Sequence, residues 1–307
     1  MTQAFAFIFA QKIREIFGIE TQVLFNALDN APYDIVDRDG VSYQMDFCHA
    51  HSRKDIDNIV DSLYGVYFKN LQNILSINYS IKYYSDDQLN PIFRKKFIES
   101  IKCYDKLKWY LDPSTASLCY RTTCSCCWYA DKWGINTKAI EFTNDFLTIR
   151  SHCFEHGDYQ SKITHDNDVF FDLSTIYRNI IKESVYCDTS ENELFVMVKG
   201  SDWSVSTPFV DCGLEIMGYK ISNVPITRIF TPQIIDSTGA KLAKSSASDL
   251  IKTSMNDLNW LKDSQQILSN SERTRKIVSL CQYLMLQPKN FYRCYSINEI
   301  ERLLELI

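Results

Sequence analysis

The run Thr21-Gln-Val-Leu-Phe-Asn-Ala-Leu28 is short and rich in β-branched and aromatic side chains, which predicts a buried strand. Residues 3–17, just before it, carry apolar side chains at helical spacing, and Gly18 stands where helices commonly end in a left-handed conformation. A helix followed by a strand at this distance is half of a β-α-β unit. The opening of the chain therefore indicates a parallel sheet covered by helices.

The same alternation continues on both sides of a different central segment. Apolar spacing predicts helices over residues 55–75, 91–107, 173–184 and 207–217, and apolar runs predict strands over residues 77–84, 193–199 and 225–235. Beyond residue 247 the apolar stripes predict helix to the end of the chain. The predicted fold class is α/β, with a Rossmann-like parallel sheet interrupted by an insertion and followed by a helical segment.

Length, charge and composition exclude several classes of protein. The chain has 307 residues, of which 45% are hydrophobic and 23% charged, so it can bury a core and is not a disordered chain. Its net charge of −5 argues against general electrostatic binding of nucleic acid. No apolar run reaches the roughly 18 residues of a membrane helix, and residues 4–10 make a poor export signal. We therefore expect a cytoplasmic protein with reduced cysteines and no membrane partner.

Five of the eleven cysteines and three of the five histidines lie between residues 111 and 165. Cys124-Ser-Cys-Cys127 contains a C-x-x-C pair, and Cys153-Phe-Glu-His156-Gly157, after 25 intervening residues, supplies a C-x-x-H pair with a glycine suited to a tight turn. Two such pairs can hold one Zn²⁺ tetrahedrally, and four protein ligands leave no open position for catalysis. We predict a structural zinc site made by Cys124, Cys127, Cys153 and His156.

Two alternatives to this zinc site stay open. Buried free cysteines are common apolar fillers of protein cores, so the cluster does not by itself require a metal. Other residues of the same segment could also replace one of the four ligands. These are Cys119, Cys126 and His152.

Two segments that follow predicted strands carry groups suited to a nucleotide. Thr238-Gly-Ala-Lys241-Leu-Ala-Lys244-Ser245 sets two lysines three residues apart on a glycine-led loop. Lys199-Gly-Ser-Asp202-Trp203 ends the preceding strand, at the edge where open α/β sheets bind ligands. The lysine loop lacks the glycine pattern of a P-loop, and by itself it is also compatible with an ordinary solvated turn. Taken together, the two segments favour a triphosphate site.

These motifs and their order resemble those of class I aminoacyl-tRNA synthetases. Lys241-Leu-Ala-Lys244-Ser245 resembles the KMSKS signature, and Gly200-Ser-Asp202 resembles the G-x-D element after the fourth strand. With a zinc ribbon between two halves of the fold, the chain looks most like the archaeal-type class I lysyl-tRNA synthetases over roughly residues 2–250. The resemblance divides the chain into a first half of the nucleotide-binding fold (1–110), a zinc-binding insertion (111–167), a second half with the KMSKS-like loop (168–247) and a helical C-terminal segment (248–307).

The resemblance implies ATP-dependent activation of an amino acid, with lysine as the best guess for the substrate. The amino-acid carboxylate would attack the α-phosphate of ATP, with Mg²⁺ accompanying the nucleotide, to give an aminoacyl adenylate and pyrophosphate. Lys244 would stabilise the transition state, Lys241 would hold the outer phosphates and Ser245 would fix the loop. Gly200 and Asp202 would belong to the ATP site, and Asp202 would accept hydrogen bonds from the ribose or a substrate amine.

The chain also departs from the family pattern. The HIGH signature is absent, and Cys48-His-Ala-His51 is not at a strand–helix turn, so we interpret it as a pair of loop histidines. Asp29, at the end of the first strand, is a candidate substrate contact. The segment after residue 247 is too short to read an anticodon, although Arg273, Arg275 and Lys276 could touch RNA. The expected partners are therefore an amino acid, ATP and the acceptor end of a tRNA or another acceptor.

Two other functions compete with amino-acid activation. A homologue or fragment that kept the fold and lost turnover would serve as a binding or regulatory protein, and the missing HIGH signature favours this alternative. A zinc-ribbon nucleic-acid-binding module on an unrelated α/β scaffold is a third interpretation. The cysteine segment is not basic, which disfavours this third interpretation.

The start of the chain gives one further expectation. In the family, HIGH follows a strand that lies between the second and fourth strands, and the first residues of this chain match the helix after HIGH. A missing central strand leaves its neighbours with unpaired backbone groups, so we expect the natural protein to begin some tens of residues upstream or the chain to be a decayed fragment. The strands at residues 23–28 and 194–199 should then flank a gap or form an edge, with Met1 near the ATP site.

Overall fold

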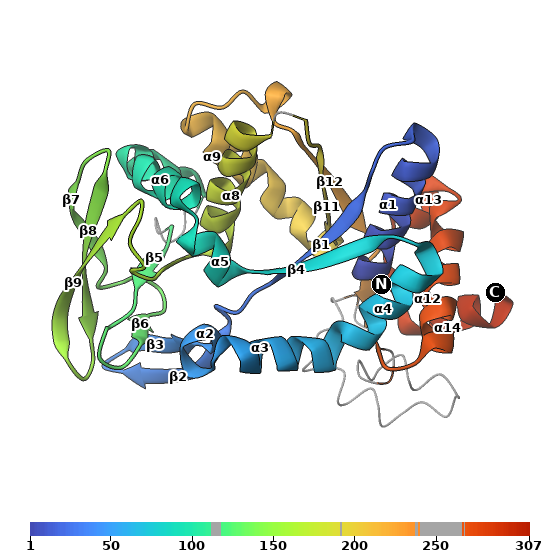
Figure 1. Cartoon of the computed structure of the whole chain (residues 1–307), viewed down its shortest axis with the longest axis horizontal. Helices are drawn as coiled ribbons and strands as arrows, with labels where there is room; N and C mark the ends of the chain where they lie inside the picture. Colours follow the sequence, from blue (N-terminus) through green and yellow to red (C-terminus); the bar gives the residue numbers. More distant parts are fainter. Residues whose placement is uncertain (112–117, 191, 237–238, 240–265, 267) are drawn as a thin grey trace.

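Two pairs of parallel strands lie at the centre of the molecule (Figure 1). The computed structural model describes residues 1–111, 118–190, 192–236, 239, 266 and 268–307. The pairs are β1 (Gln22–Ala27) with β4 (Asn78–Tyr83), and β11 (Phe195–Gly200) with β12 (Ile226–Thr231). Within the described chain, β1 and β11 belong to different sheets. The protein is α/β as predicted, but its described central strands form two separate parallel pairs and not one Rossmann-like sheet, and β1 does not pair with β11.

Helix α1 (Thr2–Phe17) explains how the two strand pairs stay together without a shared sheet. It contacts both β1 and β11, and its Phe5, Phe7 and Ile8 are buried among apolar side chains. Gly18 ends the helix at φ +66°, in the left-handed region that the sequence predicted. Apolar packing on α1 thus joins the pairs at the place where backbone hydrogen bonds between them are missing.

The beginning of α1 lies at the carboxyl end of the second strand pair. Thr2 Oγ1 lies 3.1 Å from Thr231 Oγ1, and Thr231 is the register partner of Gly200. The first residues of the chain therefore lie at the strand edge that carries the predicted ATP-site residue Gly200. Strands β1 and β11, which we expected to flank a gap or form an edge, do not pair with each other.

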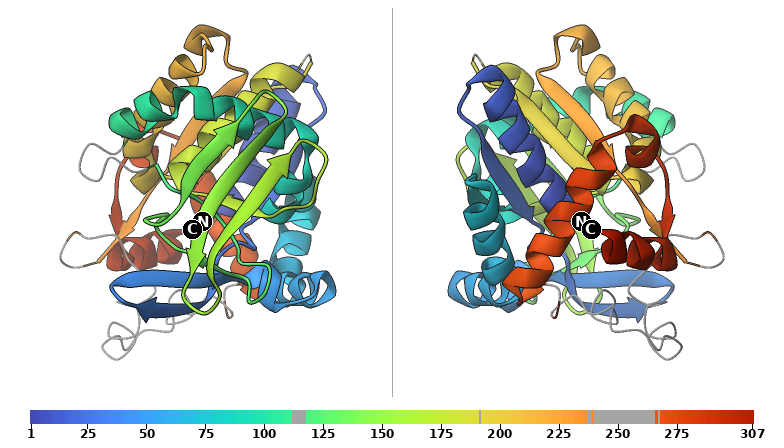
Figure 2. Two further views of the ribbon diagram at one scale, coloured as in Figure 1. Left: turned by 90° about the vertical axis from the view of Figure 1, so that its left-hand side faces the viewer. Right: turned by 90° about the vertical axis from the view of Figure 1, so that its right-hand side faces the viewer.

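Two large hydrophobic cores lie on opposite sides of the strand pairs. The first core lies under α1 and the helices α4 (Val66–Leu75), α12 (Ser271–Met285), α13 (Pro288–Phe291) and α14 (Ile297–Leu306). Figure 2 shows α1 and α12 side by side over the strands. The second core is built by α6 (Pro91–Ser100), α7 (Tyr104–Leu111), α8 (Thr175–Thr189) and α9 (Thr207–Ile216), with strands of the insertion.

Strand pairing joins the predicted insertion to the rest of the fold. Its own antiparallel sheet consists of β7 (Lys138–Phe142), β8 (Phe146–Cys153) and β9 (Gly157–Thr164). The segment also pairs outside itself, through β5 (Tyr120–Thr122) with β10 (Phe171–Leu173) and β6 (Tyr129–Asp131) with β3 (Val41–Asp46). Residues 118–167 are therefore positioned by both halves of the chain.

One hairpin was not predicted from the sequence. Strand β2 (Pro32–Arg38) pairs antiparallel with β3 through a tight turn in which Asp39 and Gly40 both have positive φ, 51° and 78°. Asp-Gly is a strong signal for this kind of two-residue turn. The predicted helix over residues 55–75 is present as α3 (Arg53–Val60), a π turn (Asp61–Gly65) and α4.

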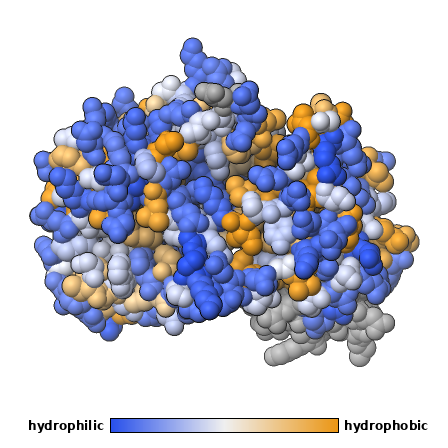
Figure 3. All heavy atoms as spheres, in the orientation of Figure 1, coloured by the Kyte–Doolittle hydropathy of each residue, from blue (hydrophilic) through white to orange (hydrophobic). Residues whose placement is uncertain are grey.

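The other described elements are short and connect the main ones. They are α2 (Phe47–Ala50), α5 (Tyr84–Leu89), β13 (Ile234–Ile235), which pairs parallel with β14 (Tyr295–Ser296), and the 3₁₀ turns Ile101–Cys103, Ser201–Ser206 and Ile221–Asn223. Across the described residues, no helix is long and apolar enough to cross a membrane. Hydrophilic residues dominate the face drawn in Figure 3, where hydrophobic ones gather in small groups.

Candidate functional site

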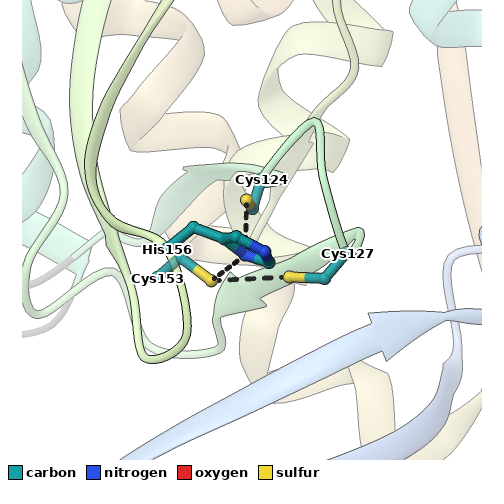
Figure 4. A group of neighbouring side chains, drawn as sticks. All are labelled: Cys124, Cys127, Cys153 and His156. Carbon is teal, nitrogen blue, oxygen red and sulfur yellow. Dashed lines mark hydrogen bonds between the residues drawn. The ribbon is translucent and has the colours of Figure 1, made fainter.

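A tight turn between β5 and β6 presents the first two predicted metal ligands. The backbone N–H of Trp128 donates to the carbonyl of Cys124 at 2.8 Å, and the N–H of Cys124 donates to the carbonyl of Tyr129 at 2.9 Å. Trp128 has a φ of +64°, so the chain reverses sharply just after Cys127. This geometry points both thiols of the C-x-x-C pair toward the same side of the turn (Figure 4).

The second pair of ligands lies at the tip of the β8–β9 hairpin. Cys153 ends β8 and is the register partner of Gly157, and His156 lies in the turn between them. Gly157 has a φ of +75°, a conformation that side chains with a Cβ seldom adopt, which is why glycine suits this position. Both turns therefore have the backbone geometry of metal-binding knuckles.

The four ligand atoms converge on one point (Figure 4). The sulfur and imidazole nitrogen atoms of Cys124, Cys127, Cys153 and His156 all lie within 4.8 Å of one another. Sγ of Cys127 lies 3.4 Å from Sγ of Cys153, too far for a disulfide bond. His156 Nδ1 lies 3.6 Å from Sγ of Cys124 and 3.5 Å from Sγ of Cys153. This cluster could hold one metal ion such as zinc.

The substitute ligands lie outside the cluster. The Cys126 side chain is exposed, the Cys119 thiol donates to the carbonyl of Lys132, and His152 Nδ1 lies 2.7 Å from Asp158 Oδ1. The environment of Cys124 is itself suited to a thiolate. Burial raises its pKa, but hydrogen bonds from the backbone N–H groups of Cys126 and Cys127, together with those from the thiols of Cys127 and Cys153, leave the pKa of Cys124 lowered. A thiolate is the form that binds metal.

The metal cluster is joined to a second, buried group of charged side chains. Arg121 lies in β5, three residues before Cys124, and donates through Nη1 to the carbonyl of Lys132 at 2.7 Å. Its Nη2 donates to the carboxylate of Asp172 and lies 3.9 Å from Asp46 Oδ1. The turn that presents the thiols thus also aims a guanidinium at two carboxylates.

These groups belong to what we call the acidic pocket, formed by Asp29, Asp46, Asp172, Asn30 and Arg121. All five residues are at most 9% exposed. Asp172 Oδ1 accepts hydrogen bonds from Asn30 Nδ2 and from the N–H of Leu173, each at 2.8 Å. Among the described residues of the pocket there are three carboxylates and one guanidinium, and the guanidinium pairs with two of the carboxylates, Asp172 and Asp46. The pocket is therefore short of positive charge.

Three polar atoms of the acidic pocket have no hydrogen-bond partner among the described residues: the acceptors Asp46 Oδ2 and Asn30 Oδ1, and the donor Arg121 Nε. Asp46 Oδ1 accepts from Gln44, but its Oδ2 accepts no hydrogen bond, and Asn30 Oδ1 also lacks a donor. Burial, together with the charge of Asp172, raises the pKa of Asp46 to about 7 against the lowering effect of Arg121 and Gln44. Unpaired buried acceptors are costly, so the two acceptors mark the place where a donor is missing.

Asp29, the predicted substrate contact, lies in this pocket at the carboxyl end of β1. Its Oδ1 accepts from the N–H of Ser85 at 3.0 Å and its Oδ2 from the hydroxyl of Ser85 at 2.5 Å. Asp29 is thus anchored by the beginning of α5, and its carbonyl accepts from the N–H of Cys48. The sequence indicated Asp29 through its place after a strand, but not Asp46 or Asp172, whose partners are distant in sequence.

The histidines near Asp29 are held by aromatic rings. His49 stacks on Trp128 with ring centroids 4.7 Å apart and meets the edge of Phe170 at 4.3 Å. Burial lowers the pKa of His49 to about 4, so the ring is neutral at physiological pH. His51 packs against Phe47 at 4.4 Å. Both histidines therefore contribute to packing around the acidic pocket, and Trp128 links that packing to the metal turn.

The residues predicted for ATP fall in two groups. Gly200 ends β11, and a Cβ added to it would lie 2.5 Å from Asp202 Oδ1, so the Asp202 side chain folds back over a position that only glycine fills without a shift. Lys241, Lys244 and Ser245 lie outside the described residues, as does most of the loop that carries them. The structure therefore places Gly200 and Asp202 together and leaves the lysine loop as a prediction.

Comparison of the sequence with protein-family models and with curated proteins finds no match.

Proposed function

We propose that this chain activates an amino acid with ATP, as class I aminoacyl-tRNA synthetases do, and that lysine is its substrate. The observation that carries the proposal is the acidic pocket at the carboxyl end of β1, where buried carboxylates outnumber the cations around them in the described chain. Open α/β sheets bind ligands at this edge. A protonated amine would supply the missing charge.

The free acceptors of the pocket match such an amine. An ammonium group has three donors, and Asp46 Oδ2 and Asn30 Oδ1 are two buried acceptors that lack donors. Charge-assisted hydrogen bonds are the strong ones, and they would offset the cost of burying the ligand's charge. Every amino acid carries one amine and lysine carries a second. The pocket therefore favours an amine-bearing substrate over a neutral one.

The proposed reaction needs positioning and positive charge more than covalent help. An oxygen of the amino-acid carboxylate forms a bond to the α-phosphorus of ATP, and the bond from that phosphorus to the bridging oxygen breaks, so that pyrophosphate leaves with its electron pair. Negative charge grows on the phosphates, where Lys241, Lys244 and the Mg²⁺ that accompanies ATP would act. The adenylate would then pass its acyl group to the acceptor end of a tRNA or to another acceptor.

We also propose that the metal of the Cys₃His cluster is a structural Zn²⁺. Thiolate and imidazole ligands in a set of four suit zinc, and they leave no open coordination position for substrate. Zinc would fix the turn that carries Trp128. Because Arg121 lies in β5 only three residues before Cys124, zinc would also help to hold its guanidinium in place. Its contribution to the reaction would therefore be to keep the acidic pocket in shape.

Amino-acid-dependent exchange of pyrophosphate into ATP tests the proposal, with the zinc-loaded protein and each of the twenty amino acids. We expect exchange with lysine above all others, and a loss of about 10²–10³-fold in rate for Lys244→Ala, the usual cost of one well-aimed group. If none of the twenty amino acids supported exchange, the proposal of an activating enzyme would be refuted. If lysine still bound to that protein, the binding or regulatory homologue would be favoured instead.

A further inference from the structure

A second cluster of charged side chains lies beside the acidic pocket, and most of its members are cations. We call it the basic cluster: Lys82 of β4, Arg178 and Lys182 of α8, and Lys199 of β11. Lys182 Nζ donates to Asn26 Oδ1 of β1 at 2.7 Å and lies 3.8 Å from Asp87 Oδ2. Lys82 pairs with the other oxygen of Asp87. One carboxylate is thus shared by two ammonium groups.

The described groups around the basic cluster leave an excess of positive charge. Glu183 acts electrostatically on Lys199 of the cluster, and Glu183 and its neighbour Asp211 are both paired with a fifth cation, Arg228. Five cations therefore face three carboxylates in this part of the described chain. Burial and the repulsion of Lys82, Arg178 and Lys199 lower the pKa of Lys182 to about 8. Cations are crowded here at a cost to the folded state.

Arg178 has an unused donor in this cluster. The residue is 8% exposed, its Nη2 donates to Thr175 Oγ1 at 3.2 Å, and its Nη1 has no hydrogen-bond partner among the described residues. The guanidinium lies over the ring of Tyr84, 4.7 Å from its centroid. Arg178 Nη1 is thus a buried cationic donor without an acceptor, whereas Asp46 Oδ2 is a buried anionic acceptor without a donor. Each marks a place for a ligand group of opposite charge.

The cluster can be reached from outside at the ends of the parallel strands. Asn26, which accepts from Lys182, is exposed, and the Lys82 side chain is 33% exposed. Lys82 and Lys199 are each the penultimate residue of a parallel strand. Tyr84 is close to both charged groups, since Asp172 of the acidic pocket and Arg178 of the basic cluster both act on its hydroxyl group. A ligand carrying opposite charges at its two ends could therefore span them.

We propose that the basic cluster binds a polyphosphate, with Lys82, Arg178, Lys182 and Lys199 contacting its oxygens. A guanidinium presents a fork of donors to phosphate, and lysines supply compact positive charge. Identification of the polyphosphate as that of ATP rests on the proposed function; the anion site itself rests only on these contacts. In this chain, which lacks the HIGH histidines, the cluster would hold the outer phosphates.

Calorimetric titration of the full zinc-loaded chain with tripolyphosphate tests the site without any need for catalysis. We expect Lys182→Gln to weaken binding by about 10–100-fold, the usual loss when one charged hydrogen-bond partner is removed. Lys69→Gln, which removes an exposed lysine of α4, should leave binding unchanged. Lys182→Arg should keep much of the affinity, because it keeps the charge. Wild-type affinity in Lys182→Gln, or no binding by the wild-type protein, would overturn the proposal.

Two further titrations separate the sources of phosphate. ATP and tripolyphosphate should bind at least about tenfold more tightly than inorganic phosphate, since more charges are neutralised. Equal binding of inorganic phosphate would overturn the assignment to a polyphosphate. Binding of tripolyphosphate that depends on Lys182 would support the anion site even if no amino acid supports pyrophosphate exchange. In that case only the proposed enzymatic function would fail.

Discussion

The Cys₃His cluster and the neighbouring charged groups differ in how many of their polar atoms find a partner within the protein. The four metal ligands come from two adjacent turns, and their atoms already lie within 4.8 Å of one another. The acidic pocket and the basic cluster, together the charged junction, draw on strands and helices far apart in sequence and keep buried polar atoms without partners. The first region thus offers a closed set of ligand atoms for one metal ion, whereas the second keeps unpaired buried atoms that a bound ligand would satisfy. Metal binding should therefore stabilise the fold, and the charged junction should cost stability until a ligand fills it.

Loss of a metal ligand should destabilise the protein more than any change within the charged junction. Cys124→Ser removes one of the four ligands, and because structural zinc supplies much of the folding energy of such segments, we expect a loss of stability of about 5 kcal/mol or more and less than one zinc per chain. Metal analysis and thermal unfolding measure both. Cys126→Ser is the matched control, since this exposed neighbour lies outside the cluster. Full zinc content in Cys124→Ser would show that the cluster does not bind as described.

Removal of the guanidinium from the acidic pocket should have the next largest effect. Arg121→Met leaves Asp172 and Asp46 buried without their cation, which should lower the free energy of unfolding by about 3–5 kcal/mol in urea titrations. Adding Asp172→Asn to this variant should recover part of the loss, because one uncompensated charge is gone. Lys12→Met, which breaks an exposed pair with Glu15, should change stability by less than about 1 kcal/mol. Equal effects of the two variants would contradict a buried, charge-deficient pocket.

The pH dependence of stability should report Asp46. It faces Asp172, Asp29, Arg121 and Gln44, and its pKa rises from 3.8 to about 7 on folding. The folded state therefore holds more protons than the unfolded chain between pH 4 and 7, so the free energy of unfolding should fall as the pH rises through this window. One proton gives a slope of at most about 1.4 kcal/mol per pH unit. Asp46→Asn should flatten this component, and an unchanged slope in that variant would exclude Asp46 as its source.

The smallest expected effect on stability comes from the basic cluster, where a substitution should not lower the free energy of unfolding. Burial and like charges lower the pKa of Lys182 from 10.5 to about 8, so the folded state disfavours its ammonium form. Lys182→Met should therefore leave stability unchanged or raise it by up to about 1 kcal/mol at pH 7, while tripolyphosphate binding is lost. Chemical denaturation of both proteins in phosphate-free buffer measures this. A loss of more than about 1 kcal/mol would assign Lys182 a structural role.

The parts of this protein that sequence alone could predict are those set by local patterns. The helix ending at Gly18, the strands β1, β4 and β11 and the four metal ligands follow from periodicity and short spacing, and the structure has them. The β2–β3 hairpin was missed even though its Asp39–Gly40 turn is a strong local signal. This hairpin was therefore predictable from local sequence as well.

Other features depend on contacts that no local pattern encodes. The two strand pairs lie in different sheets, and α1 packs against both β1 and β11, which is a tertiary contact. The acidic pocket joins Asp29, Asp46 and Asp172 through Arg121 and Asn30, residues whose separation in sequence hides their proximity. Charged residues at these positions could equally have been exposed. Only their burial, at most 9% exposed, shows that they form one site.

The central claim is that the charged junction binds a cationic amine at one end and phosphates at the other. A crystal structure of the zinc-loaded protein with lysine and a non-hydrolysable ATP analogue tests it most directly. We expect an amine of lysine at hydrogen-bond distance, about 3 Å, from Asp46 Oδ2, and phosphate oxygens on Arg178 Nη1 and Lys182. Ligands bound elsewhere, or an empty junction in a protein whose metal cluster is loaded and intact, would contradict this account.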